Sequence, residues 1–367
     1  MSARYNAVIV GQTGVGKSTL INYLYGKKVA EAGVGKPVTK NGFHPIDFEI
    51  NGLPVCLFDS WGLEVGKHEE WLQDLDNEFK QRGVNEPADK WFHSVFYCIN
   101  AGSARIQECD ITIIKKFIAE NYKVSVILTK ADQISEDVED ILRKEIQSQI
   151  NGLSVIGVCS EGKTRAGISQ TFGKKDIERQ AFNDFFDSLI LRLPLRCKGL
   201  MDQALEDWVE ESKEKAKDNI GIIGWWKDDV GNGIKYSATQ LQKKMQELIN
   251  TEIKKTFEMY GTFGSLLGYP PSELDDSNEK ASYFKRIKSD NNIDTEEFEG
   301  LWWKISLVIV LIPVLLPIGI YVAKDSAIEE IEKYIYECKS EFQIIINNQV
   351  KDVTRMLESV KLKITGQ

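Results

Sequence analysis

The stretch GQTGVGKSTL, residues 11–20, contains the residue types that bind phosphate. It follows the apolar run AVIV and matches the pattern GxxxxGK[ST], in which a glycine-rich turn lets backbone N–H groups face a phosphate. The Lys17 ammonium would bridge phosphate oxygens, and the Ser18 hydroxyl would bind Mg²⁺. A plain glycine turn that only lets a helix pack closely is the alternative, but the strand before and the helix-forming STLINYLYG after favour a nucleotide phosphate site.

A second motif, TKAD at 129–132, selects the base of that nucleotide. It follows the apolar run VSVIL, so it falls at the carboxyl end of an expected strand, where an open α/β sheet binds its ligand. The Asp132 carboxylate can accept hydrogen bonds from both N1–H and the 2-amino group of guanine, a pair that adenine does not offer. The sequence therefore predicts a guanine nucleotide.

With these motifs in this order, residues 4–195 resemble the Ras-like superfamily of small GTPase domains, and within it the Era and TrmE-like branch. KPVTK resembles the switch I motif, with Thr39 as the Mg²⁺-sensing threonine, and DSWG (59–62) resembles the DxxG motif. The resemblance implies that Asp59 holds Mg²⁺ through water and that Gly62 donates its N–H to the γ-phosphate.

The resemblance also implies that Lys130 lines the base pocket and that a backbone N–H near Ser160 reaches guanine O6. Mg²⁺ is the expected cofactor, with GTP or GDP as the ligand. The predicted catalytic residues are Lys17, Thr39 and Gly62, and the predicted metal-binding residues are Ser18, Thr39 and, through water, Asp59. The predicted GTP-binding residues are Gly11, Thr13, Gly14, Val15, Gly16, Lys17, Ser18, Thr19, Asp59, Gly62, Thr129, Lys130, Asp132 and Ser160.

Three positions depart from the family pattern. Leu63 stands where Ras-type domains carry the glutamine that orients the attacking water, so we expect slow intrinsic hydrolysis and dependence on another group, on dimerisation or on a partner. Thr129 replaces the commoner asparagine, which should weaken a hydrogen bond between loops without changing the base. Gly14 replaces the asparagine of potassium-activated relatives, so we predict no K⁺ dependence.

The elements that must position these residues are short apolar strands separated by segments of helical length. Continuous apolar strands suit a mostly parallel sheet that is covered on both faces, so the expected fold is α/β and doubly wound, with a GTP-binding domain at 1–195. The expected strands are YNAVIVG, LPVCLFD, SVFYCIN, KVSVILTK and LSVIGVCS.

The remaining residues, 196–367, predict an α-helical domain. Helical patterns occur at 205–217 and 241–260. Apolar residues three or four positions apart, Val350 among them, form a stripe that predicts one long amphipathic helix over 326–364. That helix suits bundle packing or pairing with a second copy.

Residues 305–323 contain no charged residue, and three interpretations stay open: a bilayer-spanning helix, an inserted hairpin, or the buried helix of a bundle. Flanking tryptophans and lysines favour membrane contact. Pro313 and Pro317 count against a simple spanning helix.

The composition and net charge of the chain limit the kinds of partner that it is expected to bind. The net charge of −9 disfavours nucleic acid, although GTFG at 261–264 fits the GxxG loop of an RNA-binding module. Six cysteines without CxxC spacing, and a start that enters a strand directly, predict a cytoplasmic protein, with membrane association if 305–323 inserts. We expect a slow GTP-hydrolysing switch coupled to a module that binds membrane lipid or a second copy. A nucleotide-gated non-catalytic interaction protein and a ribosome- or RNA-associated GTPase are the alternatives.

Overall fold

The structure is a computed structural model that describes residues 4–26, 42–50, 53–60, 63, 67–103, 105–164, 167–168, 170–219, 229–266 and 320–365. The chain divides into two compact units. Unit 1 comprises residues 1–193, 256–269 and 361–367, and unit 2 comprises residues 194–255 and 270–360.

Unit 1 contains a six-stranded sheet of order β2-β3-β1-β4-β5-β6. Its strands are β1 (Tyr5–Gly11), β2 (Phe43–Ile50), β3 (Leu53–Ser60), β4 (Ser94–Asn100), β5 (Val124–Thr129) and β6 (Ser154–Val158). All neighbours pair in parallel except β2, which runs antiparallel to β3. The five expected strands and the doubly wound fold are confirmed. The sequence analysis missed the edge strand β2 and the short hairpin of β7 (Lys163–Thr164) and β8 (Gly167–Ile168).

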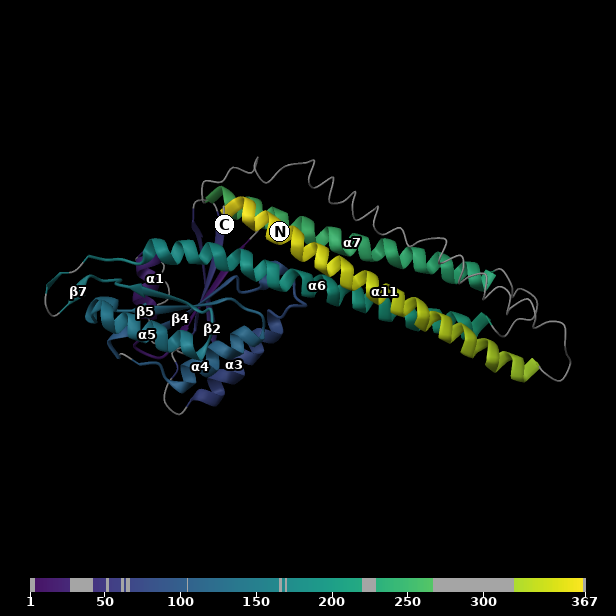
Figure 1. Cartoon of the computed structure of the whole chain (residues 1–367), viewed down its shortest axis with the longest axis horizontal. Coiled ribbons are helices and arrows are strands. Elements are labelled where there is room, and N and C mark those ends of the chain that lie inside the picture. Colours follow the sequence, from purple (N-terminus) through teal and green to yellow (C-terminus); the bar gives the residue numbers. More distant parts are fainter. Residues whose placement is uncertain are drawn as a thin grey trace. The chain divides into compact units, whose positions relative to one another are not determined.

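Helices cover both faces of this sheet. They include α1 (Lys17–Tyr25), α3 (His68–Gln81), α4 (Glu108–Ala119) and α5 (Glu136–Gln149), with short 3₁₀ turns η1 (Ala88–Lys90), η2 (Ala101–Ser103) and η3 (Ala131–Gln133). In Figure 1, α1 and the start of α6 (Lys174–Asn219) lie on one side of the strands, and α3, α4 and α5 lie on the other. Alternate residues of β1 therefore face different helices, and both sets are buried, which explains its continuous apolar sequence.

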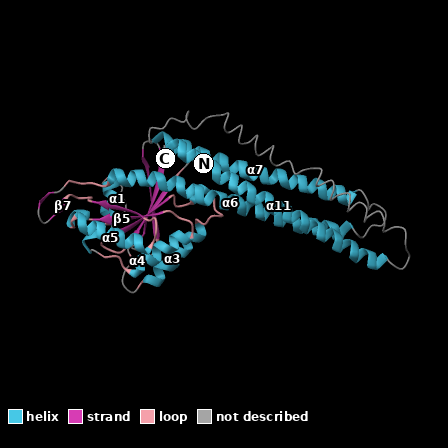
Figure 2. Ribbon diagram, in the orientation of Figure 1, coloured by secondary structure: helices cyan, strands magenta, loops and turns pink. Residues whose placement is uncertain are grey.

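Three long helices dominate the rest of the chain: α6, α7 (Asp229–Leu266) and α11 (Ile320–Thr365), which run alongside one another in Figure 2. Within unit 2, Trp208 of α6 packs against Phe342 of α11 and donates its indole N–H to the Ser237 hydroxyl of α7. A buried ion pair, Arg196 with Glu252 at 2.6 Å, also joins α6 to α7. These helices are longer than the sequence patterns indicated, and the expected domain boundary at residue 195 lies inside α6.

The buried face of α11 repeats every eleven residues, since positions 335, 338, 342 and 346 are followed by 346, 349, 353 and 357. An eleven-residue repeat averages 3.67 residues per turn, slightly more than the 3.6 of an ideal α-helix, so the buried face drifts slowly around the helix in the sense of a right-handed supercoil. The predicted stripe placed Val350 in this face, but the structure buries Gln349 there instead. The apolar pattern failed at this position because the buried residue is polar.

Two expectations concerned residues 196–367: an RNA-binding loop at 261–264 and the uncharged segment 305–323. GTFG at 261–264 lies within α7, so it is not the loop of an RNA-binding module. Of the uncharged segment 305–323, only residues 320–323 belong to the described part of the chain, where they begin α11. Among the described helices, none combines the length and the apolar character needed to cross a membrane.

Candidate functional site

The phosphate-binding motif forms the turn between β1 and α1. Gly14 and Gly16 adopt positive φ angles of 80° and 103°, and α1 begins at Lys17. A Cβ on Gly11 would lie 2.4 Å from the carbonyl oxygen of Cys98, so only glycine fits between β1 and β4. The turn therefore exposes backbone N–H groups at the N-terminus of a helix, where the dipole favours an anion.

Lys17 is held at the centre of this turn. Its Nζ donates hydrogen bonds to the carbonyl oxygens of Gly11, at 2.9 Å, and Gln12, at 3.0 Å. Burial lowers the pKa of the Lys17 ammonium, while Cys98 and Asp59 act in the opposite direction. The two backbone carbonyls thus orient the ammonium within the turn.

Asp59 lies near the end of β3, paired in register with Ile9 of β1. Its Oδ1 is buried and has no hydrogen-bond partner among the described residues. Burial raises the pKa of the Asp59 carboxyl, and the nearby Lys17 ammonium opposes that rise. A buried acceptor without a donor suits the hydrogen of a metal-bound water, and the exposed Ser18 at the start of α1 offers an oxygen ligand. These residues therefore fit a Mg²⁺ site.

Leu63 follows the DxxG motif and contacts the phosphate-binding turn through its backbone. Its N–H donates to the Gly11 carbonyl at 3.4 Å, and its carbonyl accepts from the Thr13 N–H at 3.2 Å. The Leu63 side chain is only 8% exposed and belongs to the apolar core that α3, α4 and α5 form with the sheet. It therefore points into the core and has no group that could orient water.

The base-recognition motif lies at the carboxyl ends of β5 and β6. The hydroxyl of Thr129, at the end of β5, lies within hydrogen-bond distance of the carbonyls of Val15 and Ile99, so it ties this loop to the phosphate-binding turn. The Lys130 Nζ donates to the Gly14 carbonyl at 3.3 Å. Asp132 is half-buried in η3, and Ser160 follows the end of β6.

The described residues of the predicted site thus gather at one edge of the sheet, where β1 has β3 on one side and β4 on the other. That edge is where an open α/β sheet binds its ligand. Thr19 is half-buried in α1. Two predicted residues, Thr39 and Gly62, fall outside the described part of the chain, as does the rest of the KPVTK motif.

The sequence analysis missed a buried carboxylate beside the phosphate-binding turn. Asp110 of α4 is 3% exposed, and its Oδ1 accepts hydrogen bonds from the Tyr97 hydroxyl at 2.7 Å and from the Gln12 side-chain amide at 2.9 Å. It also completes a capping box with Gln107 at the start of α4. The capping pattern QECD was visible in the sequence, but its proximity to Gln12 depends on the tertiary fold.

Comparison with known proteins agrees with this geometry. Residues 6–146, from β1 into α5, match a protein family described as 50S ribosome-binding GTPase. The probable GTP-binding protein EngB of Aquifex aeolicus is 28% identical over 182 residues, covering 48% of this chain and 88% of that protein.

Two further relatives match at lower identity. Cell division control protein 10 of Candida albicans is 21% identical over 168 residues, covering 40% of this chain and 47% of that protein. Septin-14 of Mus musculus is 21% identical over 349 residues, covering 80% of this chain and 79% of that protein. The chain thus spans about half the length of the first of these two relatives.

Proposed function

We propose that this chain, which carries a P-loop GTPase domain at residues 6–146, is a GTP-dependent switch that hydrolyses GTP slowly by itself and passes its nucleotide state to the long helices. GTP binding and hydrolysis are the activity of this class of domain. The observation that carries the proposal is the gathering of Lys17, Asp59 and the TKAD loop at one sheet edge, with Leu63 turned into the core.

In this function the backbone of the glycine turn binds the β-phosphate, and Lys17 neutralises charge on the β and γ oxygens. Ser18, Thr39 and, through water, Asp59 would hold Mg²⁺, which would supply positive charge to the phosphates. Asp132 selects guanine, and Lys130 supports the base while its Nζ bonds the Gly14 carbonyl.

We expect slow intrinsic GTP hydrolysis because Leu63 stands where related domains carry the glutamine that orients the attacking water. A side chain fixed in the apolar core cannot orient the attacking water, and an external group that stabilises the transferring phosphate accelerates such reactions by about 10³ to 10⁵ fold. We therefore expect turnover to rise with a partner or with a second copy of the chain.

The first experiment measures nucleotide affinity and single-turnover hydrolysis over a range of protein concentrations. Lys17→Ala should abolish GTP binding, while Lys115→Ala, which removes an exposed lysine of α4, should leave it unchanged. Unchanged GTP affinity in the Lys17 variant would refute the site. A bound GTP that never turns over at any concentration would favour the non-catalytic alternative.

The second experiment asks what the helical part contacts. The full chain, loaded with GDP or a non-hydrolysable GTP analogue, is tested for flotation with anionic lipid vesicles and for a change in mass by light scattering. Nucleotide-dependent flotation or assembly supports the coupling. A chain that stays monomeric and does not float with vesicles in either nucleotide state would refute this coupling to lipid or to a second copy. Salt-dependent sedimentation with ribosomes would instead favour ribosome binding, which the description of the matched family names.

A further inference from the structure

Arg192, a residue of α6 that belongs to unit 1, is a buried arginine with no acidic partner among the described residues. Its side chain is completely buried, and among the described residues no carboxylate forms an ion pair with it. Its guanidinium lies 3.9 Å from the ring centre of Tyr122 and 4.9 Å from that of Trp91. Because a charge buried without a counter-ion is costly, something else must stabilise it.

The ends of two helices provide that stabilisation. Arg192 Nη2 donates to the carbonyl of Arg82 at 2.7 Å, and Nη1 donates to the carbonyl of Glu120 at 2.6 Å. Arg82 is the C-terminal cap of α3, and Glu120 is the C-terminal cap of α4. The carbonyl ends of helices carry partial negative charge, so one guanidinium binds the negative ends of both helix dipoles.

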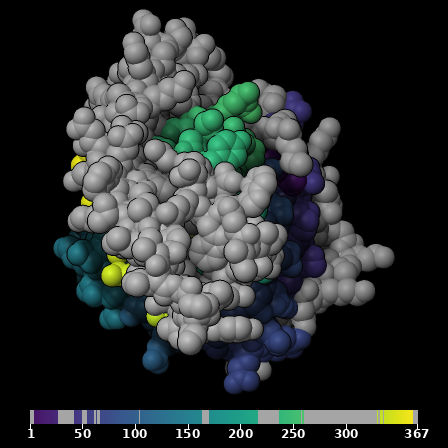
Figure 3. Space-filling model, turned by 90° about the vertical axis from the view of Figure 1, so that its right-hand side faces the viewer, coloured from purple at the N-terminus to yellow at the C-terminus, as the bar shows by residue number. Residues whose placement is uncertain are grey.

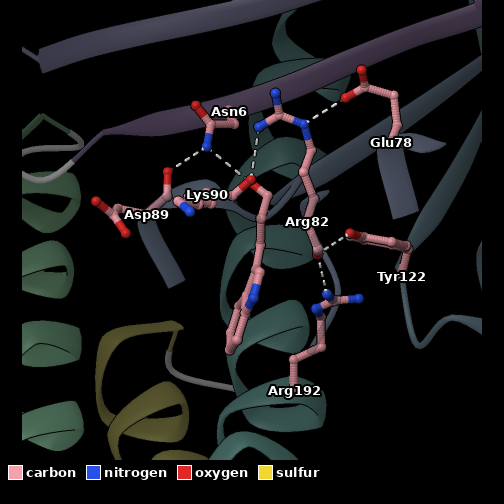
Figure 4. A network of polar contacts seen from close by, with 8 residues as sticks. Asn6, Glu78, Arg82, Asp89, Lys90, Tyr122 and Arg192 are labelled. Carbon is pink, nitrogen blue, oxygen red and sulfur yellow. Dashed lines mark hydrogen bonds and ion pairs between the residues drawn. The ribbon is translucent and has the colours of Figure 1, made fainter. Parts of the chain in front are cut away.

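A second arginine fixes the segment that leaves α3, as Figure 4 shows. Arg82 lies 4.0 Å above the ring of Phe58, bonds the Glu78 carboxylate and donates to the Lys90 carbonyl at 2.9 Å. The Tyr122 hydroxyl donates to the same Arg82 carbonyl that Arg192 binds, at 2.6 Å. The C-terminal end of α3 is therefore held by three side chains, and the Arg192 contact comes from α6.

The other end of α3 lies next to the nucleotide motif. The helix begins at His68, a few residues after the DxxG motif and Leu63, and Trp71 and Leu75 bury one side of it completely. Its other side is charged and exposed, and blue atoms of this part of the chain reach the surface in Figure 3. Rigid secondary elements are one means by which coupling is carried through a protein, and α3 joins the neighbourhood of the nucleotide motif to the Arg192 contact.

We propose that Arg192 is a positioning residue that couples α3 to α6, so that a displacement of α3 between the GDP and GTP states changes the position of α6. This proposal rests on the proposed function, since it requires that nucleotide moves α3. Such coupling is reciprocal, so a partner that binds and displaces α6 also changes the affinity for the nucleotide. The helix α6 continues past Pro194 to residue 219, so part of it belongs to unit 1 and part to unit 2.

The test is amide hydrogen exchange of the full chain, with GDP or with a non-hydrolysable GTP analogue. We expect exchange rates to differ between the two states by about fivefold or more in α3 and in α6 around residues 184–193. In Arg192→Met, which keeps length and burial but loses both hydrogen bonds, the difference should persist in α3 and disappear in α6. Arg179→Met, which removes an exposed arginine of the same helix, should retain both differences.

Two results refute the coupling. In the first, exchange in α3 of the wild-type chain differs between the two nucleotide states but exchange in α6 does not. In the second, the difference in α6 remains in Arg192→Met. If the methionine variant does not fold, Arg192→Lys replaces it as the test. Lysine keeps the charge but has one donor nitrogen in place of the two that bind Arg82 and Glu120, so it should reduce the α6 response relative to that of α3. The same experiment shows separately whether the proposed function fails. If the chain does not bind guanine nucleotides, the phosphate-binding turn at 11–18 shows no protection from exchange with either nucleotide, and the proposed coupling is refuted as well.

Discussion

The buried carboxyl of Asp184, in α6, should make the stability of unit 1 decrease as the pH rises through about 6. Its carboxylate is 2% exposed and accepts hydrogen bonds from the Ser125 hydroxyl of β5 and the Gln180 amide, both at 2.8 Å. Burial raises the pKa of this carboxyl from its ordinary 3.8 to about 6, against the lowering effect of its two hydrogen bonds. The ionised carboxylate therefore costs folding free energy at neutral pH.

The magnitude follows from linkage. Because the folded pKa lies above the unfolded one, the folded chain holds the extra proton between about pH 4 and pH 6. The stabilisation of the protonated group is complete below the unfolded pKa and is lost as pH rises through about 6. The rise from 3.8 to about 6 corresponds to about 3 kcal/mol.

Asp184→Asn should remove this dependence. The asparagine oxygen can accept from Gln180 while its N–H donates to Ser125, so both hydrogen bonds survive. Relative to the wild-type chain, the variant should gain about 3 kcal/mol of unfolding free energy between pH 4 and pH 7. Urea denaturation followed by tryptophan fluorescence at several pH values measures that difference, with Asp176→Asn, at an exposed aspartate of α6, as the matched control.

A difference between Asp184→Asn and wild type that stays constant within about 0.5 kcal/mol from pH 4 to pH 7 would refute the reasoning. It would mean that the Asp184 carboxylate is as well solvated in the folded chain as in the unfolded one. A pH-dependent difference of equal size in Asp176→Asn would refute it too, because the effect would then not depend on burial.

Further predictions concern the base, the helical bundle and the core. Asp132→Asn should shift nucleotide preference from guanine toward xanthine in competition binding, and retained guanine selectivity would contradict the base assignment. Glu252→Ala should destabilise unit 2 by about 3–5 kcal/mol in denaturation experiments, because it removes the carboxylate that forms an ion pair with the buried Arg196. Trp71→Ala should cost unit 1 about 3–5 kcal/mol, since this fully buried ring would leave a cavity, and a loss below about 1 kcal/mol would contradict that packing.

The five parallel strands of the sheet and the motifs of most of the candidate site could be predicted from the sequence. Local patterns carry that information, because each buried strand is a continuous apolar run and each loop motif directly follows its strand. The order of those strands then brings Lys17, Asp59 and Asp132 to one sheet edge, which is a property of parallel topology rather than of any single contact.

Tertiary structure alone decided the contacts between residues far apart in the chain. In the sequence, Arg192 is one charged residue in a long helix, and only packing against Arg82 and Glu120 makes it a link between helix ends. Gln349 looked like a solvent-facing residue beside Val350, yet the eleven-residue repeat of α11 buries it. Sequence patterns record the average polarity of a helix face, whereas the burial of one residue on that face depends on the neighbours that the fold packs against it.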